Sequence, residues 1–173
     1  MEKRYAVGID LGTSNSALAF SPAREEGRIA VLPVTQLLAF QTVGELEILP
    51  SALYLPLENE VAGAAARLPW ESDPLGGVVG QLAREHGALV PNRLVTSAKS
   101  WLSNPHVGPE KPVLPWQSDL GERKVSAFEA SRRYLEHLRH ALRWTLRQRG
   151  GEAGPQDCEV VVTVPASFDE VAR

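Results

Sequence analysis

Cysteine is nearly missing from this sequence: Cys158 is the single one among 173 residues. One thiol permits no internal disulfide, and it cannot supply a metal cluster built on several cysteines. Disulfide-stabilised secreted domains and cysteine-rich zinc modules are therefore excluded. The composition fits a protein of the reducing cytoplasm.

Long apolar runs are also missing. Lys3 and Arg4 precede a short apolar segment, as at the start of a signal peptide, but Asp10 interrupts that segment after five residues. This is too short for the hydrophobic region of a signal peptide. No other stretch approaches the ~18 apolar residues needed to cross a bilayer. We therefore expect a cytoplasmic chain with no membrane partner.

The chain has no excess of positive charge, since its formal net charge is -3. Its total charge therefore does not attract phosphate polymers or anionic membranes. Arginines are concentrated between residues 132 and 149, yet Glu129 and Glu136 interrupt that positive field. Arginines near a helix C-terminus also complement the helix dipole. Nucleic acid is therefore not an expected partner.

Apolar residues make up 43% of the chain, which is enough for a sizeable core. Three strand patterns at the start, separated by turns, predict an antiparallel meander. The elements expected before the longest helix are strands at 5–11, 16–20, 28–34 and 51–57, short helices at 63–67 and 78–85, and a proline-rich surface loop at 105–125.

The clearest helix is predicted from Ser126 to about Arg149. Ser126 is a suitable N-cap, Glu129 stands three residues later, and the glycine pair at 150–151 ends the pattern. The apolar residues that recur at helical spacing are Phe128, Leu135, Leu138, Leu142 and Leu146. This face is expected to pack against another part of the fold.

A further strand is predicted after the helix. Val160 to Val164 is an unbroken β-branched run, which is typical of a strand covered on both faces. Pro165 ends the run, because proline cannot donate to a sheet ladder. Together with the meander and the long amphipathic helix, this strand predicts an α/β domain with a mixed sheet.

The sharpest motif spans residues 8–16, Gly-Ile-Asp-Leu-Gly-Thr-Ser-Asn-Ser. Asp10 ends a buried strand, and Gly12 allows phosphate oxygens to approach the backbone N–H groups of the turn. Thr13 and Ser14 add hydroxyl donors. A single carboxylate beside phosphates suits Mg²⁺, which keeps several of its waters. The alternative is an ordinary β-hairpin with a glycine turn and an exposed aspartate.

A second motif lies near the other end. Residues 164–168, Val-Pro-Ala-Ser-Phe, close a strand and are followed by an acidic helix start and Arg173. With the motif at 8–16, in this order, they resemble the heat-shock 70 (DnaK-like) family of stress-response chaperones. Segments 49–53, 61–67 and 91–102 resemble that family's Pro-Ser strand, Gly-x-Ala-Ala helix and Ala-Lys-Arg-Leu segment. The resemblance thus extends over nearly the whole chain.

This resemblance implies the first lobe of an actin-like, ribonuclease-H-like ATPase domain over residues 1–173. The second lobe and the peptide-binding domain would follow Arg173, so the chain is expected to be truncated and inactive as an ATPase by itself. For the full-length protein the implied ligands are ATP and Mg²⁺. The implied partners are unfolded client peptides, a J-domain co-chaperone and a nucleotide exchange factor.

The resemblance also implies catalytic roles for Asp10 and Lys99. Asp10 would hold Mg²⁺ through water, and Lys99 would stabilise the charge that develops near the γ-phosphate. The other implied site residues are Gly12, Thr13, Ser14 and Asn15 for phosphate binding, and Pro165 and Arg173 for coupling the nucleotide state to peptide binding. The alternative for Lys99 is a solvated surface lysine.

The sequence departs from the family pattern in several places. Surplus residues around 33–48 and 68–77 lengthen the path from Asp10 to Lys99, and Ser167 replaces a usual tyrosine. These changes indicate a divergent branch of the family.

Two other functions fit part of the same pattern. A small-molecule kinase of the actin-like fold, such as a sugar or acetate kinase, also opens with an Asp-x-Gly-Thr hairpin, but it does not need the Val-Pro-Ala-x-Phe segment. A non-catalytic scaffold of that fold would not need intact Asp10, Thr13 and Lys99. We therefore predict an ATP-hydrolysing chaperone.

Overall fold

The main sheet of the protein is mixed. The computed structural model describes residues 5–22, 28–61, 65–70, 76–149 and 157–163. The strands of this sheet are β1 (Tyr5–Asp10), β2 (Asn15–Pro22), β3 (Ala30–Val31), β6 (Leu49–Pro50) and β10 (Cys158–Thr163). Their order is β10-β1-β2-β3, with β6 also paired to β2. The β1-β2-β3 meander is antiparallel, and β10 is parallel to β1, so both the meander and the mixed sheet are confirmed.

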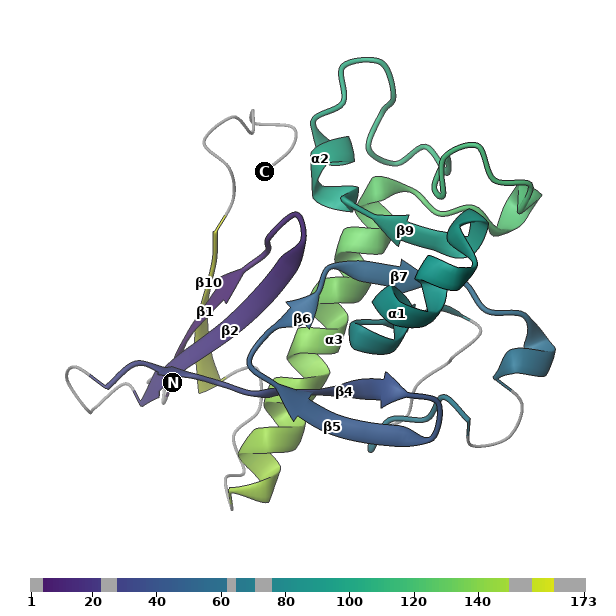
Figure 1. Ribbon diagram of the computed structural model, residues 1–173. Helices are drawn as coiled ribbons and strands as arrows, with labels where there is room; N and C mark the ends of the chain where they lie inside the picture. Colours follow the sequence, from purple (N-terminus) through teal and green to yellow (C-terminus); the bar gives the residue numbers. More distant parts are fainter. Residues whose placement is uncertain (1–4, 23–27, 62–64, 71–75, 150–156, 164–173) are drawn as a thin grey trace.

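Two smaller sheets lie beside the main one (Figure 1). The first is a hairpin of β4 (Val34–Ala39) and β5 (Thr42–Leu46); the second places β7 (Ala52–Tyr54) between β8 (Val78–Val79) and β9 (Leu94–Thr96). The hairpin was not predicted, because its turn contains Gln41 at φ 62° and no glycine or proline to mark it. The strand predicted at 51–57 is real but shorter.

The helices are α1 (Gln81–Leu89), α2 (Ala98–Leu102) and α3 (Ala127–Gln148), with short 3-10 turns at Glu58–Glu60, Pro91–Arg93 and Gly121–Arg123. The prediction for α3 is confirmed: Ser126 Oγ accepts a 3.0 Å hydrogen bond from the backbone N–H of Glu129. This bond satisfies one of the free N–H groups of the first turn. Among the helices of the described ranges, none is long and apolar enough to cross a membrane.

Of the two predicted short helices, the one at 78–85 is confirmed in part, because residues 81–85 belong to α1, and the one at 63–67 is not formed in its described part. The segment 78–85 begins as strand β8, and Gly80 at φ 98° separates the strand from α1. A short apolar run cannot distinguish strand from helix by periodicity alone, and here pairing with β7 decides it. Within 63–67, Ala65 and Ala66 form a turn rather than a helix, and residues 63 and 64 lie outside the described residues.

One core joins the sheets to α3. Val7 and Leu18 of the main sheet, Leu53 of the second small sheet, and Tyr134 and Leu138 of α3 are all almost completely buried in a single cluster. Figure 1 shows α3 running between the main sheet and the two smaller sheets in this view. Phe128 shares the helical spacing but is exposed, although Ala127 and Ala130 of the same turn belong to this core.

The prediction that residues 160–164 form a strand covered on both faces was wrong for the described part. Val160, Val161 and Val162 belong to β10 but are exposed, and Val161 retains 62% of its accessible surface. The reason is position: within the described residues, β10 has a neighbouring strand on one side only. The β-branched run specified a strand, and the sheet order decided its exposure.

Candidate functional site

The carboxylate of Asp10 lies where two parallel strands end together. Asp10 is the last residue of β1 and Thr163 the last of β10, and the parallel register places them opposite each other. Thr163 Oγ1 donates a 2.7 Å hydrogen bond to Asp10 Oδ1, and Asp10 is exposed. The bond from Thr163 orients the carboxylate, and its exposure makes it accessible. The carboxyl ends of strands are also where ligands bind in open α/β sheets.

The loop after Asp10 leaves no space for a side chain at its first turn. A Cβ added at Gly12 would lie 2.0 Å from the backbone oxygen of Asn15, so any other residue would force the loop open. Thr13, Ser14 and Asn15 are exposed along the same loop. The structure therefore brings Asp10 and the four expected phosphate-binding residues together in one compact hairpin.

A buried serine outside the motif fixes the shape of this loop. Ser51 Oγ donates a 2.8 Å hydrogen bond to the backbone oxygen of Gly12, and the Ser51 backbone N–H donates to the Ser14 oxygen at 2.9 Å. Ser16 Oγ lies 2.9 Å from Ser51 Oγ. Because the Ser51 hydroxyl proton is used on Gly12, Ser16 is the donor in that contact. Sequence reasoning missed this role, although Ser51 stood within the Pro-Ser segment.

Lys99 comes from a different element. It is the second residue of α2, whose buried Ala98 packs into the core while α2 itself contacts α3. The Lys99 side chain is half-buried, and the described residues give its ammonium group no hydrogen bond or ion pair. Among the described residues, therefore, no hydrogen bond or ion pair connects Lys99 to the Asp10 hairpin. Pro165 and Arg173 lie outside the described residues.

A metal ion bound at this hairpin would have one protein carboxylate, that of Asp10, to hold it. In the described ranges, no three His, Cys, Asp or Glu side chains are grouped as a metal site. Mg²⁺ is usually fixed by one or two carboxylates together with its waters and substrate phosphates. The exposed Asp10 carboxylate, held by Thr163 beside the narrow Gly12 loop, fits that mode of binding.

The charge cluster around Glu60 is structural. Glu60 accepts hydrogen bonds from Arg93, from the Tyr54 hydroxyl and from the Leu57 backbone N–H. Burial by itself would raise the pKa of Glu60, but these bonds outweigh it and lower that pKa to about 2. Burial and the bond to Glu60 raise the pKa of Tyr54 to about 12. Every acceptor site of the carboxylate is occupied, so the cluster binds the 54–60 segment to the 91–93 turn.

Comparison with known proteins identifies relatives along the whole chain. The chain is 38% identical over 173 residues to a protein named "Chaperone protein HscA homolog" from Pseudomonas putida. Proteins of the same name from Azotobacter vinelandii and Haemophilus influenzae are 32% and 31% identical. Each match covers 99% of this chain and 24% of the relative. The chain thus spans about a quarter of the length of these relatives.

No protein-family model matches the chain. The similarity to the chaperones nevertheless includes both motif regions, since it leaves out almost none of the chain. The residues 8–16, folded as a closed hairpin, and the strand at 158–163 lie in the order that the resemblance requires. This similarity over 99% of the chain supports its identification with the N-terminal region of the heat-shock 70 chaperone family.

Proposed function

We propose that this chain contributes one wall of the ATP site in a heat-shock 70 chaperone that hydrolyses ATP in its full-length form. One observation carries the proposal: an exposed, oriented carboxylate, Asp10, stands beside a loop that admits only glycine at position 12. The named relatives are chaperones, which favours this function over a small-molecule kinase.

The loop is the part that meets the polyphosphate. Backbone N–H groups around Gly12 and the hydroxyls of Thr13 and Ser14 donate to phosphate oxygens, and Asn15 closes the loop. Asp10 would hold Mg²⁺ through water, and such an ion would supply positive charge beside the phosphates. Ser51 keeps the loop in this shape before the nucleotide arrives, so binding requires little reorganisation.

Lys99 acts on the reaction rather than on ground-state binding. Lys99 is half-buried, and its ammonium group, which has no protein partner among the described residues, is available to a charge that appears during the reaction. Phosphoryl transfer depends mainly on positioning and on electrostatic stabilisation of the transition state. Lys99 is therefore assigned to the γ-phosphate and its attacking water.

The whole-protein properties follow from family membership. Residues 1–173 form the first lobe of an actin-like domain, and a second lobe supplies the adenosine contacts. Pro165 and Arg173 couple the nucleotide state to the binding of unfolded client peptides. A J-domain co-chaperone and a nucleotide exchange factor regulate this cycle in the cytoplasm.

Lys99→Ala in the full-length protein tests the proposal. We expect ATP turnover to fall at least ~100-fold while nucleotide affinity changes much less, because the lost group acts on transition-state charge. Asp10→Asn is expected to reduce both affinity and turnover, since it weakens the metal site. Lys111→Ala, at an exposed lysine, is the matched control and leaves both unchanged.

The two variants separate the possible failures. If Lys99→Ala hydrolyses ATP at the wild-type rate in a single turnover, Lys99 has no catalytic role and is a solvated surface lysine. The assignment of the Asp10 hairpin to phosphate binding would not be affected. Unchanged nucleotide affinity and turnover in Asp10→Asn would contradict the ATP site itself, and a non-catalytic scaffold would then be the better description.

A further inference from the structure

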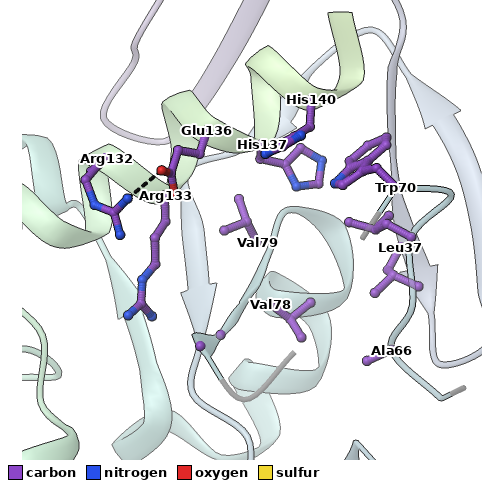
Figure 2. Close-up of a pocket in the computed structure, with 13 residues that line it drawn as sticks. Leu37, Ala66, Trp70, Val78, Val79, Arg132, Arg133, Glu136, His137 and His140 are labelled. Atoms are coloured by element: carbon purple, nitrogen blue, oxygen red, sulfur yellow. Dashed lines mark hydrogen bonds and ion pairs between the residues drawn. The ribbon is translucent and has the colours of Figure 1, made fainter. Parts of the chain in front are cut away.

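A cavity of about 360 Å³ opens between α3, β8 and the segment at 65–70, and the strands of the phosphate hairpin do not line it. Its size is in the range of small-molecule sites. Figure 2 shows the rings of His137, His140 and Trp70 together at one end, the Arg133 guanidinium at the other, and Val79 between them. None of these residues belongs to the hairpin.

The ring end of the cavity is an aromatic cluster. The Trp70 ring stacks on His140 with centroids 6.0 Å apart and an interplanar angle of 12°. It meets His137 edge-on, with centroids 5.5 Å apart at 79°. Val78 and Val79 add apolar surface beside these rings. Offset and edge-to-face arrangements of this kind favour a further planar ring.

Both histidines are uncharged at neutral pH. Burial lowers the pKa of His137 to about 4, although its bond to the Thr35 carbonyl opposes the shift. His137 Nε2 lies 3.0 Å from that carbonyl oxygen and must therefore carry the proton, which leaves Nδ1 as an acceptor. Burial also lowers the pKa of His140, with Arg139 and Arg143 adding to the effect. The positive charge of the cavity therefore comes from arginine.

Arg133 has an unused donor at the cavity. Its Nε donates to Glu129 at 2.8 Å, but Nη1 is buried and has no hydrogen-bond partner among the described residues. Arg132, which also lines the cavity, uses its guanidinium on Glu129 and Glu136. A buried donor without a partner is unfavourable, so Arg133 Nη1 is the group that an incoming acceptor would satisfy.

Glycine at position 77 allows this arrangement. Gly77 has φ 121°, and a Cβ there would lie 3.0 Å from Arg133 Nη1 and 2.5 Å from Leu53 Cδ1. The backbone can therefore pass close to the guanidinium, where a side chain at position 77 would crowd Arg133 Nη1. The cavity thus combines aromatic rings, apolar walls and one unpaired cationic donor.

We propose that this cavity binds a small aromatic carboxylate, with its ring against Trp70 and His140 and its carboxylate on Arg133. A charged acceptor suits Arg133 best, because hydrogen bonds between ionised partners are shorter and stronger than neutral ones. The site shares no residue with the ATP hairpin. It is a second ligand site of the chain, separate from the proposed ATPase function.

Titration of the ¹⁵N-labelled chain tests the proposal. The probes are phenylacetate and indole-3-acetate, with phenylacetamide as the uncharged counterpart, and the Trp70 indole N–H resonance, assigned through Trp70→Phe, is the readout. We expect saturable shifts of this resonance with both carboxylates and at least about tenfold weaker binding of the amide. Absence of saturable binding, or equal affinity for phenylacetate and phenylacetamide, overturns the proposal.

Substitutions on α3 locate the carboxylate. Arg133→Gln is expected to weaken phenylacetate binding at least about tenfold, whereas Arg139→Gln, an exposed arginine on the same helix, leaves it unchanged. His140→Ala removes a stacking partner of Trp70 without removing an ion pair, and it is also expected to weaken phenylacetate binding. This variant replaces Arg133→Gln in the test if Arg133→Gln does not fold. Wild-type affinity in Arg133→Gln, or in His140→Ala where that variant replaces it, contradicts the assignment.

Discussion

Replacement of Glu60 by glutamine is expected to destabilise the protein at neutral pH and much less in acid. In the native structure the Glu60 carboxylate accepts from Arg93 Nη1 at 2.5 Å, from Arg93 Nη2 and the Tyr54 hydroxyl at 3.0 Å, and from the Leu57 N–H at 2.7 Å. Glutamine keeps the shape but removes the charge, as protonation would.

The size of the effect follows from the pKa. Lowering the pKa of Glu60 from 4.5 to about 2 corresponds to at most roughly 3 kcal/mol of native-state stability. Glu60 and Arg93 keep 21% and 13% of their side-chain exposure, and water screens part of this interaction. We therefore expect Glu60→Gln to lower the free energy of unfolding by about 2 kcal/mol at pH 7.

The pH dependence has a definite sign. Because the folded pKa lies below the unfolded one, the contribution of Glu60 is complete above about pH 4.5 and is lost as the pH falls toward 2. Urea unfolding of wild type and Glu60→Gln at pH 7 and pH 3 measures it. The difference between the two proteins is expected to shrink to less than half at pH 3.

A matched substitution provides the control. Glu136→Gln removes the same charge from an exposed pair with Arg132, in which the side chains are 40% and 46% exposed, and should cost less than about 0.5 kcal/mol. A Glu60→Gln difference as small as that of Glu136→Gln, or one that does not change between pH 7 and pH 3, would refute the reasoning.

Three further predictions concern stability. Gly77→Ala is expected to cost at least about 2 kcal/mol in urea unfolding, because φ 121° is strained for alanine and its Cβ would overlap Leu53; a neutral result would mean that the backbone relaxes freely there. Ser126→Ala should cost about 1 kcal/mol by loss of the bond from Glu129, and Ser126→Asp should restore most of it. The lowered pKa of His137 means that wild-type stability falls as the pH drops from about 6.5 toward 4, by up to roughly 3 kcal/mol. In His137→Gln that part of the pH dependence should be absent.

Local sequence determined the elements whose signals lie within a few residues. The α3 boundary was predictable because Ser126 caps the N–H of Glu129, three residues away. The hairpin loop was predictable because Asp10 and Gly12 stand at the junction of two apolar runs, and only glycine fits beside the Asn15 oxygen. These features depend on chain geometry over one turn, so they do not require knowledge of the rest of the fold.

Elements that depend on distant partners were predicted less well. Val78 and Val79 form a strand because β7 pairs with them, and the exposure of Val161 follows from its place in the edge strand β10. The turn at Gln41 has no sequence signal because its positive φ is imposed by the pairing of β4 with β5. In each case a tertiary contact outweighs local propensity.

The distinction between local sequence and distant contacts also applies to the Asp10 hairpin and to the cavity beside α3. Asp10 and the Gly12 loop were evident from the sequence, whereas Thr163 and Ser51, which orient the carboxylate and hold the loop, are 153 and 39 residues away from their partners. The cavity beside α3 had no motif, since Trp70 and Arg133 come together only through packing. The sequence alone determined which groups the chain carries and the shape of its tight loop. The tertiary structure decided which distant groups meet, because hydrogen bonds and ring contacts between remote residues exist only after the sheets pack on α3.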